Sequence, residues 1–199
     1  MSADQVAAFA AVELAAVARA GGAVIFPTDT LPALAALPAH ADQIWRLKQR
    51  PRDKPLILMA ARQEDLQVAT GGAWRPEWLA MAARVWPGAV TLVLPACGPV
   101  AEALHPGGGS LGLRIPAAAR ALELLDFSGP LATTSANRSG EPACRDAAEA
   151  AIRFPAVPQL APRPWVGGSG EASTVLAWGT GGWRTLRAGA SLPLPPVHE

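Results

Sequence analysis

The chain has 199 residues, of which 50% are hydrophobic and 17% charged, so it is long enough to bury a substantial core and too apolar for a disordered protein. Its 17 basic and 16 acidic side chains nearly cancel, which argues against binding of nucleic acid through overall charge but leaves room for a local basic patch. Cys97 and Cys144 are the only cysteines and lie far apart in the sequence, so neither a disulfide framework nor a zinc motif is predicted.

The chain opens with a segment rich in Ala, Leu and Glu, which predicts a helix that ends at Gly21 and Gly22. Asp4, Glu13 and Arg19 interrupt its apolar residues, and no basic stretch precedes an apolar run. Neither a signal peptide nor a membrane span is therefore expected. We expect a cytoplasmic protein that makes no contact with a membrane.

Short apolar strands and helices alternate through the rest of the chain. This alternation favours a layered α/β fold whose sheet is largely covered, in one domain over residues 1–190 with a Pro-rich tail over 191–199. Strands are predicted at 23–26, 55–61, 90–96, 111–116 (at a sheet edge), 130–135, 173–178 and 183–189, and further helices at 39–50, 75–86, 117–127 and 144–154.

A basic cluster, RLKQRPRDK, occupies residues 46–54 and is followed at once by an apolar strand. The prolines in and after it stiffen the backbone around Lys48, Arg50 and Lys54, so these cations would lose little entropy on binding a phosphate chain. Each charged hydrogen bond to that chain would contribute about 1.5–3 kcal/mol. A solvated helix C-terminus that complements the helix dipole explains the cluster equally well when it is taken alone.

Other polar groups stand at the ends of predicted strands, where α/β proteins bind ligands. The PTDT sequence at 27–30 offers two hydroxyls and a carboxylate, although simple turn formation also explains it. Thr91 follows a Pro-Gly turn at the start of a strand. Arg114 lies alone in an apolar strand and must either reach solvent or find an anionic partner, which is a carboxylate substrate or, more commonly, a structural ion pair. The ATTSANRSG sequence at 132–140 combines small donors with a glycine, which lets a backbone approach phosphate or ribose closely.

Several familiar catalytic signatures are missing from the sequence. The Gly-rich stretch at 107–110 lacks the Lys-Ser/Thr of a P-loop, and no GxGxxG follows a strand. Three histidines give little support to a Ser-His-Asp arrangement, and no metal-ligand cluster is present. The sequence therefore predicts binding and positioning of reactants rather than a protein nucleophile or a protein-bound metal.

Taken in order, PTDT, LKQRPRDKPLIL, WPGAVTLV, LGLRIP, TTSANRSGEP, STV and LRAG resemble the YrdC family over roughly residues 10 to 189. The resemblance implies a twisted mixed sheet covered by helices, with a central positively charged cavity. It also implies an enzyme that makes threonylcarbamoyl-adenylate from L-threonine, bicarbonate and ATP, with Mg²⁺ on the phosphates and release of pyrophosphate. Partner proteins then transfer the threonylcarbamoyl group to an adenosine of tRNA. The chain is too short for the second domain of some members, so it resembles the short TsaC-like form.

The resemblance also implies roles for individual residues. Lys48 and Arg50 would position the phosphates, and no single catalytic residue is assigned. The loop after PTDT, LPALAALP, replaces an aromatic residue and glycines that the family usually carries there. By the family pattern, Arg50, Lys54, Thr91, Ser135, Asn137 and Arg187 belong to the ATP side, and Thr30, Arg114, Thr133 and Ser173 belong to the threonine side, with Arg114 on the amino-acid carboxylate.

Two other functions remain open from the sequence. The first is a related enzyme that processes carbamoyl-adenylate, which would form the adenylate from carbamoyl phosphate. The second is a non-catalytic RNA-binding module that contacts RNA or tRNA through the basic cluster, and its affinity would fall steeply with salt. The near-neutral net charge and the lack of an exposed aromatic platform count against an RNA-binding module.

Overall fold

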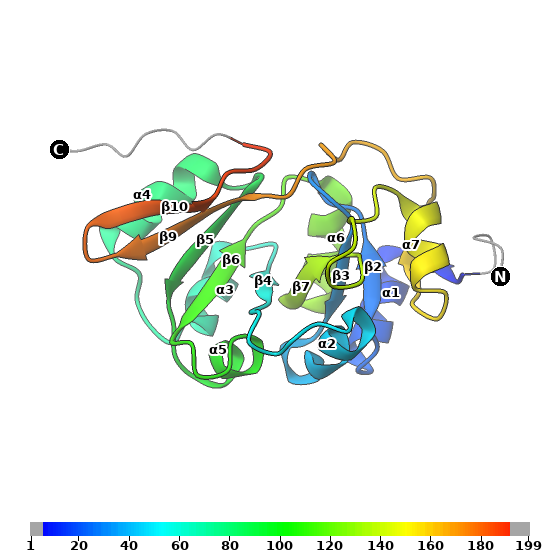
Figure 1. Ribbon diagram of the computed structural model, residues 1–199, viewed down its shortest axis with the longest axis horizontal. Coiled ribbons are helices and arrows are strands. Elements are labelled where there is room, and N and C mark those ends of the chain that lie inside the picture. The colour runs from blue at the N-terminus through cyan, green and yellow to red at the C-terminus, as the bar shows by residue number, and fades with distance from the viewer. Residues whose placement is uncertain (1–5, 192–199) are drawn as a thin grey trace.

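The computed structural model describes residues 6–191, and within them ten strands form one mixed, twisted sheet (Figure 1). The strand order is β1-β8-β2-β3-β7-β4-β6-β5-β9-β10. Apart from Ser191, the predicted Pro-rich tail lies outside the described residues. The strands are β1 (Ala8–Phe9), β2 (Val24–Phe26), β3 (Ala33–Ala36), β4 (Ile57–Met59), β5 (Val90–Pro95), β6 (Ser110–Arg114), β7 (Leu131–Ser135), β8 (Gln159–Leu160), β9 (Thr174–Gly179) and β10 (Gly182–Arg187).

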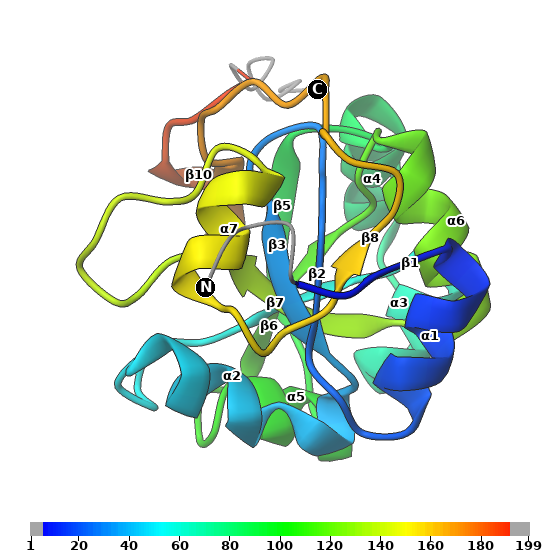
Figure 2. The ribbon, with the colours of Figure 1, turned by 90° about the vertical axis from the view of Figure 1, so that its right-hand side faces the viewer.

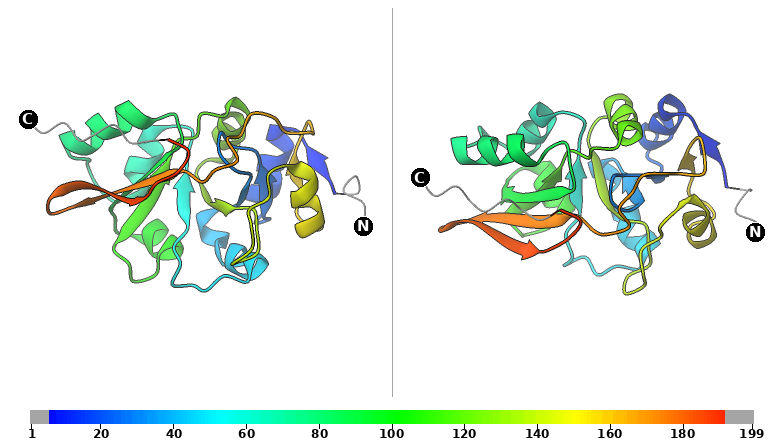
Figure 3. Two further views of the ribbon diagram at one scale, coloured as in Figure 1. Left: turned by 45° about the horizontal axis from the view of Figure 1, so that its top comes forward. Right: turned by 90° about the horizontal axis from the view of Figure 1, so that it is seen from above.

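Helices cover both faces of this sheet, which confirms the predicted α/β class. Seen from above in Figure 3, α1, α3, α4 and α6 lie along one side of the sheet, and α2 and α7 lie on the other. No helix in the described part of the chain is both long enough and apolar enough to cross a membrane. The helices are α1 (Ala11–Arg19), the 3₁₀ helix η2 (Pro38–His40), α2 (Asp42–Lys48), α3 (Gln63–Ala69), α4 (Pro76–Val85), α5 (Pro99–Leu104), α6 (Ala119–Ser128) and α7 (Ala147–Arg153).

Strand β2 explains why the sheet needs a helical layer on each face. Successive side chains of a strand point to opposite faces. Val24 and Phe26 accordingly pack into the cluster that contains α1 and α6, whereas Ile25 packs into the cluster that contains α2. All three side chains are fully buried, and burial of each contributes about 1.5–3 kcal/mol. Figure 2 shows β2 and β3 crossing the molecule between α1 on one side and α2 and α7 on the other.

The turn after α2 sets the direction of the basic cluster. Gln49 has a left-handed backbone conformation, with φ of 52°, and the Arg50 N–H donates to the Trp45 carbonyl at 2.9 Å. A left-handed residue after a helix redirects the chain while satisfying the last carbonyls of the helix. The Lys48 side chain, at the end of α2, is therefore buried, whereas the Arg50 side chain lies in the loop after the turn and is partly exposed.

Three details differ from the sequence-based predictions. The first helix begins at Ala11, because residues 8–9 pair with β8 as a short strand. Strand β6 does not lie at an edge, because β4 and β5 pair with it on either side. The loop after PTDT contains β3, a buried strand that joins β2 to β7. The ALAA sequence of β3 has low strand propensity, so pairing on both sides rather than composition determines its conformation.

Candidate functional site

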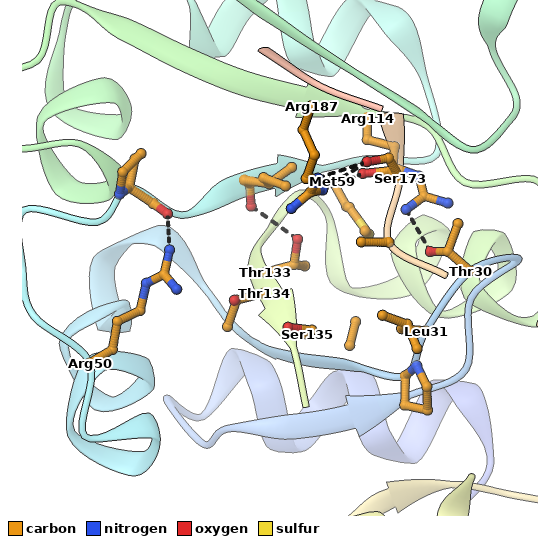
Figure 4. A pocket seen from close by; sticks show the side chains of 15 residues that line it. Thr30, Leu31, Arg50, Met59, Arg114, Thr133, Thr134, Ser135, Ser173 and Arg187 are labelled. Atoms are coloured by element: carbon orange, nitrogen blue, oxygen red, sulfur yellow. Dashed lines mark hydrogen bonds between the residues drawn. The ribbon is translucent and has the colours of Figure 1, made fainter. Parts of the chain in front are cut away.

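The candidate site lies where β4 parts from β7. The ladder between β3 and β7 continues to the Ala33–Ser135 pair, but the ladder between β4 and β7 ends at Ile57–Thr133. The last two residues of β7 therefore have no partner on the β4 side, and a cavity of about 160 Å³ occupies this part of the molecule (Figure 4). A water needs about 10–15 Å³, so the cavity has room for a ligand of roughly ten non-hydrogen atoms. Its lining includes the side chains of Arg50, Arg114 and Arg187 and five hydroxyl groups, those of Thr30, Thr133, Thr134, Ser135 and Ser173.

Arg114 forms one rim of the cavity and is held in place by three hydrogen bonds. Its Nη2 pairs with Asp29 Oδ1 at 2.8 Å, Nη1 donates to Thr30 Oγ1 at 2.8 Å, and Nε donates to the Gly88 carbonyl at 3.0 Å. Its side chain is only 3% exposed, and burial lowers the pKa of the guanidinium, an effect that Asp29 opposes. A guanidinium has five N–H donors, so two remain for a ligand.

Ser173 and Arg187 extend this rim from strands β9 and β10. Arg187 donates to the Ser173 carbonyl through Nε at 3.1 Å and through Nη2 at 2.8 Å. The Ser173 hydroxyl lies 2.9 Å from the Thr91 hydroxyl. Thr91 is buried and is not part of the lining, so it acts on the cavity through Ser173. Burial lowers the pKa of the Arg187 guanidinium.

Aromatic packing fixes the hairpin that carries Arg187. Trp178 of β9 and Trp183 of β10 pack edge to face with ring centroids 5.4 Å apart, and Trp178 packs in the same way on Trp78 of α4 at 6.3 Å. Such pairs contribute about 0.5–1.5 kcal/mol beyond the burial of their area. The hairpin is thus held against the helical layer, which places the end of β10 beside the cavity.

Lys48 supports the opposite rim from below. Its Nζ donates to the Ser135 carbonyl at 2.5 Å, to the Asn137 carbonyl at 2.9 Å and to Asn137 Oδ1 at 2.7 Å. The Ser135 hydroxyl donates to the same Asn137 Oδ1 at 2.7 Å. Burial first, and the nearby Arg50 charge second, lower the pKa of Lys48 to about 7. Lys48 and Asn137 are therefore positioning residues behind Ser135, since neither lines the cavity.

Arg50 stands on the same rim but is only half buried. Its Nη2 donates to the Pro55 carbonyl at 3.0 Å and its Nε to the Lys54 carbonyl at 3.3 Å. Burial lowers its pKa, and Asp53 opposes that shift. The Lys54 side chain is exposed and is not part of the cavity lining. The structure thus brings together seven of the predicted residues as lining, places three behind it and leaves Lys54 outside; the lining seven are Thr30, Arg50, Arg114, Thr133, Ser135, Ser173 and Arg187.

The lining residue Thr134 was not assigned from the sequence, and neither were two residues behind the Arg114 rim, Asp29 and Gly168. Asp29 is the ion-pair partner of Arg114 and also accepts from the Ala117 N–H at 3.1 Å. Its position between two threonines in PTDT was a usable signal. Gly168 lies so close to the 28–30 turn that a Cβ atom on it would be 2.6 Å from the Thr30 carbonyl oxygen. The Gly-rich sequence around it was the available signal.

No group of three or more His, Cys, Asp or Glu side chains that could hold a metal ion occurs within residues 6–191. The charged groups that face the cavity are guanidiniums, and its other donors are hydroxyls. Guanidinium groups suit carboxylates and phosphates, which they bind through paired hydrogen bonds. The arginines at the two rims of this cavity are therefore suited to contact carboxylate or phosphate groups.

The fold and this site define an α/β protein with an arginine-lined cavity between the strands of its sheet. The model of the family that comprises Sua5, YciO and YrdC, described as "Telomere recombination", matches residues 16–189. The chain therefore belongs to this family, as the sequence motifs predicted.

Three relatives of this chain are threonylcarbamoyl-AMP synthases. The protein of Pyrococcus abyssi is 38% identical over 141 residues, which are 68% of this chain and 41% of that protein. The protein of Bacillus subtilis is 40% identical over 139 residues, 65% of this chain and 39% of that protein. This chain thus spans about two fifths of these two relatives. The protein of Stutzerimonas stutzeri is shorter, and its match, 33% identical, covers 72% of this chain and 78% of that protein.

Solved structures agree with this assignment. P. abyssi Sua5 complexed with L-threonine superposes with a TM-score of 0.82 and 32% identity, over 90% of this chain and 54% of that one. E. coli YciO superposes with a TM-score of 0.76 over 90% of this chain and 88% of that one. Its identity is 21%, so the likeness to YciO establishes the fold alone.

Proposed function

We propose that this protein is a threonylcarbamoyl-AMP synthase, which converts L-threonine, bicarbonate and MgATP into threonylcarbamoyl-AMP and pyrophosphate. The observation that carries the proposal is one cavity with two arginine-bearing rims, Arg114 with Thr30 and Ser173 on one and Arg50 with Ser135 on the other. The names of the relatives and the L-threonine complex of P. abyssi Sua5 support the same activity.

L-Threonine binds at the Arg114 rim in this proposal. The two N–H groups of Arg114 that Asp29, Thr30 and Gly88 do not use are available to the amino-acid carboxylate. The ion pair with Asp29 does not prevent this, because it fixes the orientation of the guanidinium and leaves these donors unpaired. L-Threonine has eight non-hydrogen atoms, a size that suits a cavity of about 160 Å³.

The triphosphate binds at the Arg50 rim and extends out of the open side of the cavity. Arg50 is half exposed, and its two hydrogen bonds go to carbonyls of its own loop, so it can turn toward a phosphate. Ser135 is held beside it by Lys48 and Asn137. In Figure 4 the Arg187 guanidinium lies between those of Arg50 and Arg114, where it would neutralise the α-phosphate.

The reaction then follows from placement and charge. The threonine amine and bicarbonate first form a carbamate with loss of water. A carbamate oxygen then attacks the α-phosphorus of ATP. The bond between the α-phosphorus and the oxygen that bridges it to the β-phosphate breaks, and pyrophosphate leaves. Holding the reactants in one cavity supplies proximity, and the arginines neutralise charge that develops on the phosphates. Mg²⁺ accompanies ATP as part of the substrate.

Several sequence-based predictions are part of this proposal. Lys54 would have to swing inward to reach the phosphates, since its side chain is exposed. The basic cluster would contact tRNA, and partner proteins would carry the threonylcarbamoyl group onward. One domain over 1–190 and a cytoplasmic location also stay predictions.

Pyrophosphate release by the purified protein tests the proposal. Release from MgATP should require both L-threonine and bicarbonate, and mass spectrometry should detect threonylcarbamoyl-AMP. Release that is indifferent to threonine would overturn the proposal. Formation of an adenylate from carbamoyl phosphate instead would assign the protein to the related carbamoyl-adenylate enzymes.

A further inference from the structure

One of the hydroxyls that line the cavity has no hydrogen-bond partner among the described residues. Four of the five lining hydroxyls already form hydrogen bonds within the chain. Within residues 6–191, the Thr134 hydroxyl forms no such bond. These four hydroxyls are those of Thr30, which bonds to Thr28 and Arg114, of Thr133, which donates to the Ile57 carbonyl at 3.1 Å, of Ser135, which bonds to Asn137, and of Ser173, which bonds to Thr91.

The position of Thr134 points to a ligand. Thr134 follows Thr133, which is the last residue of β7 that pairs with β4. Strand β4 therefore does not pair with Thr134. Thr134 is partly exposed, and Figure 4 shows its oxygen directed into the cavity between Arg50 and Arg187. An unpaired hydroxyl at such a place is hydrated, and a bound ligand can replace that water and take the hydrogen bond.

We propose that Thr134 Oγ1 donates a hydrogen bond to an oxygen of the phosphate chain of the nucleotide. This inference rests on the proposed function, and it concerns the Arg50 rim rather than the threonine rim. Figure 4 draws Thr134 between Arg50 and the Arg187 guanidinium, whereas Arg114 and Thr30 lie across the cavity. An anionic oxygen between a guanidinium and a hydroxyl accepts charge-assisted hydrogen bonds from both.

The test compares Thr134→Val with Thr134→Ser. Valine keeps the β-branched shape that suits a strand but removes the hydroxyl, whereas serine keeps the hydroxyl. Calorimetric titration with MgATP and with inorganic tripolyphosphate should show affinity lower by roughly ten-fold in T134V, and close to that of the unmodified protein in T134S. The affinity for L-threonine, measured alone, should be the same in all three proteins.

Thr180→Val is the matched control, because Thr180 is exposed in the turn between β9 and β10 and lies outside the cavity lining. It should leave the tripolyphosphate affinity unchanged, and thermal unfolding should confirm that each variant is folded. Equal tripolyphosphate affinity in T134V and the unmodified protein would overturn the proposal, as would a loss of threonine affinity alone.

The titration also separates this proposal from the proposed function. A protein that binds tripolyphosphate more weakly as T134V, yet releases no pyrophosphate on addition of threonine, keeps the Thr134 assignment and loses the synthase activity. A protein that releases pyrophosphate in a threonine-dependent manner, with T134V unaffected in every titration, keeps the activity and loses the assignment. Failure of the unmodified protein to bind any polyphosphate would overturn both.

Discussion

The two rims of the cavity carry the same functional group in opposite states. Arg114 is buried and forms three hydrogen bonds, one of which is the ion pair to Asp29, whose side chain is only 17% exposed. Arg50 is half exposed, and both of its hydrogen bonds go to carbonyls of its own loop. The Arg114 guanidinium is buried in the folded protein, whereas the Arg50 guanidinium belongs to a partly exposed loop.

This difference separates two uses of arginine. A buried, paired guanidinium is fixed before the ligand arrives, so little entropy is lost on binding, but its removal leaves an uncompensated charge. A half-exposed guanidinium contributes little to folding and can adjust to a flexible triphosphate. The Arg114 rim should therefore respond to substitution mainly through stability, and the Arg50 rim mainly through affinity.

Arg114→Met should produce the largest effect. It leaves the partly buried Asp29 carboxylate with the Ala117 N–H as its remaining partner, so the free energy of unfolding should fall by about 3–5 kcal/mol in urea titration. Adding Asp29→Asn removes the uncompensated carboxylate and should recover part of that loss. A fall of less than about 1 kcal/mol in the single variant would show that the pair contributes nothing to folding.

Lys48→Met should have the next largest effect, because it removes the three hydrogen bonds that Lys48 Nζ donates to the Ser135 and Asn137 carbonyls and to Asn137 Oδ1. We expect a loss of about 1–3 kcal/mol. The pH dependence provides a second readout. With a pKa of about 7, folded Lys48 releases its proton at a lower pH than in the unfolded chain, where the pKa is 10.5, so stability should rise with pH above 7.

The slope of this rise should be at most about 1.4 kcal/mol per pH unit, and K48M should lack it. The chain has two lysines and no tyrosine, so few other groups titrate in this range. Burial raises the pKa of Cys144 above its usual 9.0, an effect of opposite sign that is small below pH 8, so measurement between pH 7 and 8 reports mainly on Lys48. Identical slopes in the two proteins would contradict the account of Lys48.

Gly168→Ala should sharpen the comparison by acting on the Arg114 rim alone. The added Cβ would meet the Thr30 carbonyl at 2.6 Å, so the segment whose Ser169 and Gly170 N–H groups donate to the 28–30 turn must shift. We expect a loss of about 1–3 kcal/mol and weaker threonine binding, with tripolyphosphate binding unchanged. Gly72→Ala is the control, since nothing lies within 4 Å of a Cβ at that position.

Arg50→Met should have the smallest effect on stability, below about 1 kcal/mol, and a large effect on ATP. Loss of its charged hydrogen bonds should weaken MgATP binding at least ten-fold in calorimetry. Arg52→Met is the matched control, because Arg52 forms a surface pair with Asp42 in which both side chains are more than 60% exposed. Equal ATP affinity in the two variants would break the proposed division between the rims.

The sequence predicted the fold class and most of its strands, because those strands are apolar and bounded by turns. It missed β3, whose ALAA sequence carries no strand signal and takes its conformation from β2 and β7. It also missed the short β1 and β8, which pair with each other across about 150 residues of chain. Pairing partners so distant in sequence leave no local pattern.

The candidate site, like the fold, has features that the sequence predicted and features that it did not. Motifs identified every polar lining residue except Thr134, since these residues stand at strand ends. The burial of Lys48 was not predictable, because it lies in a highly charged segment and its acceptors come from Ser135 and Asn137 in another part of the chain. The pairing of Asp29 with Arg114 joins residues 85 positions apart, and only the folded sheet brings them together.

A crystal structure of the protein with L-threonine and a non-hydrolysable ATP analogue tests the central claim most directly. The account predicts the threonine carboxylate on Arg114, the triphosphate on Arg50 and Ser135, and the α-phosphate between them near Arg187. Threonine on the Arg50 rim, or a triphosphate bound outside the cavity, would contradict it.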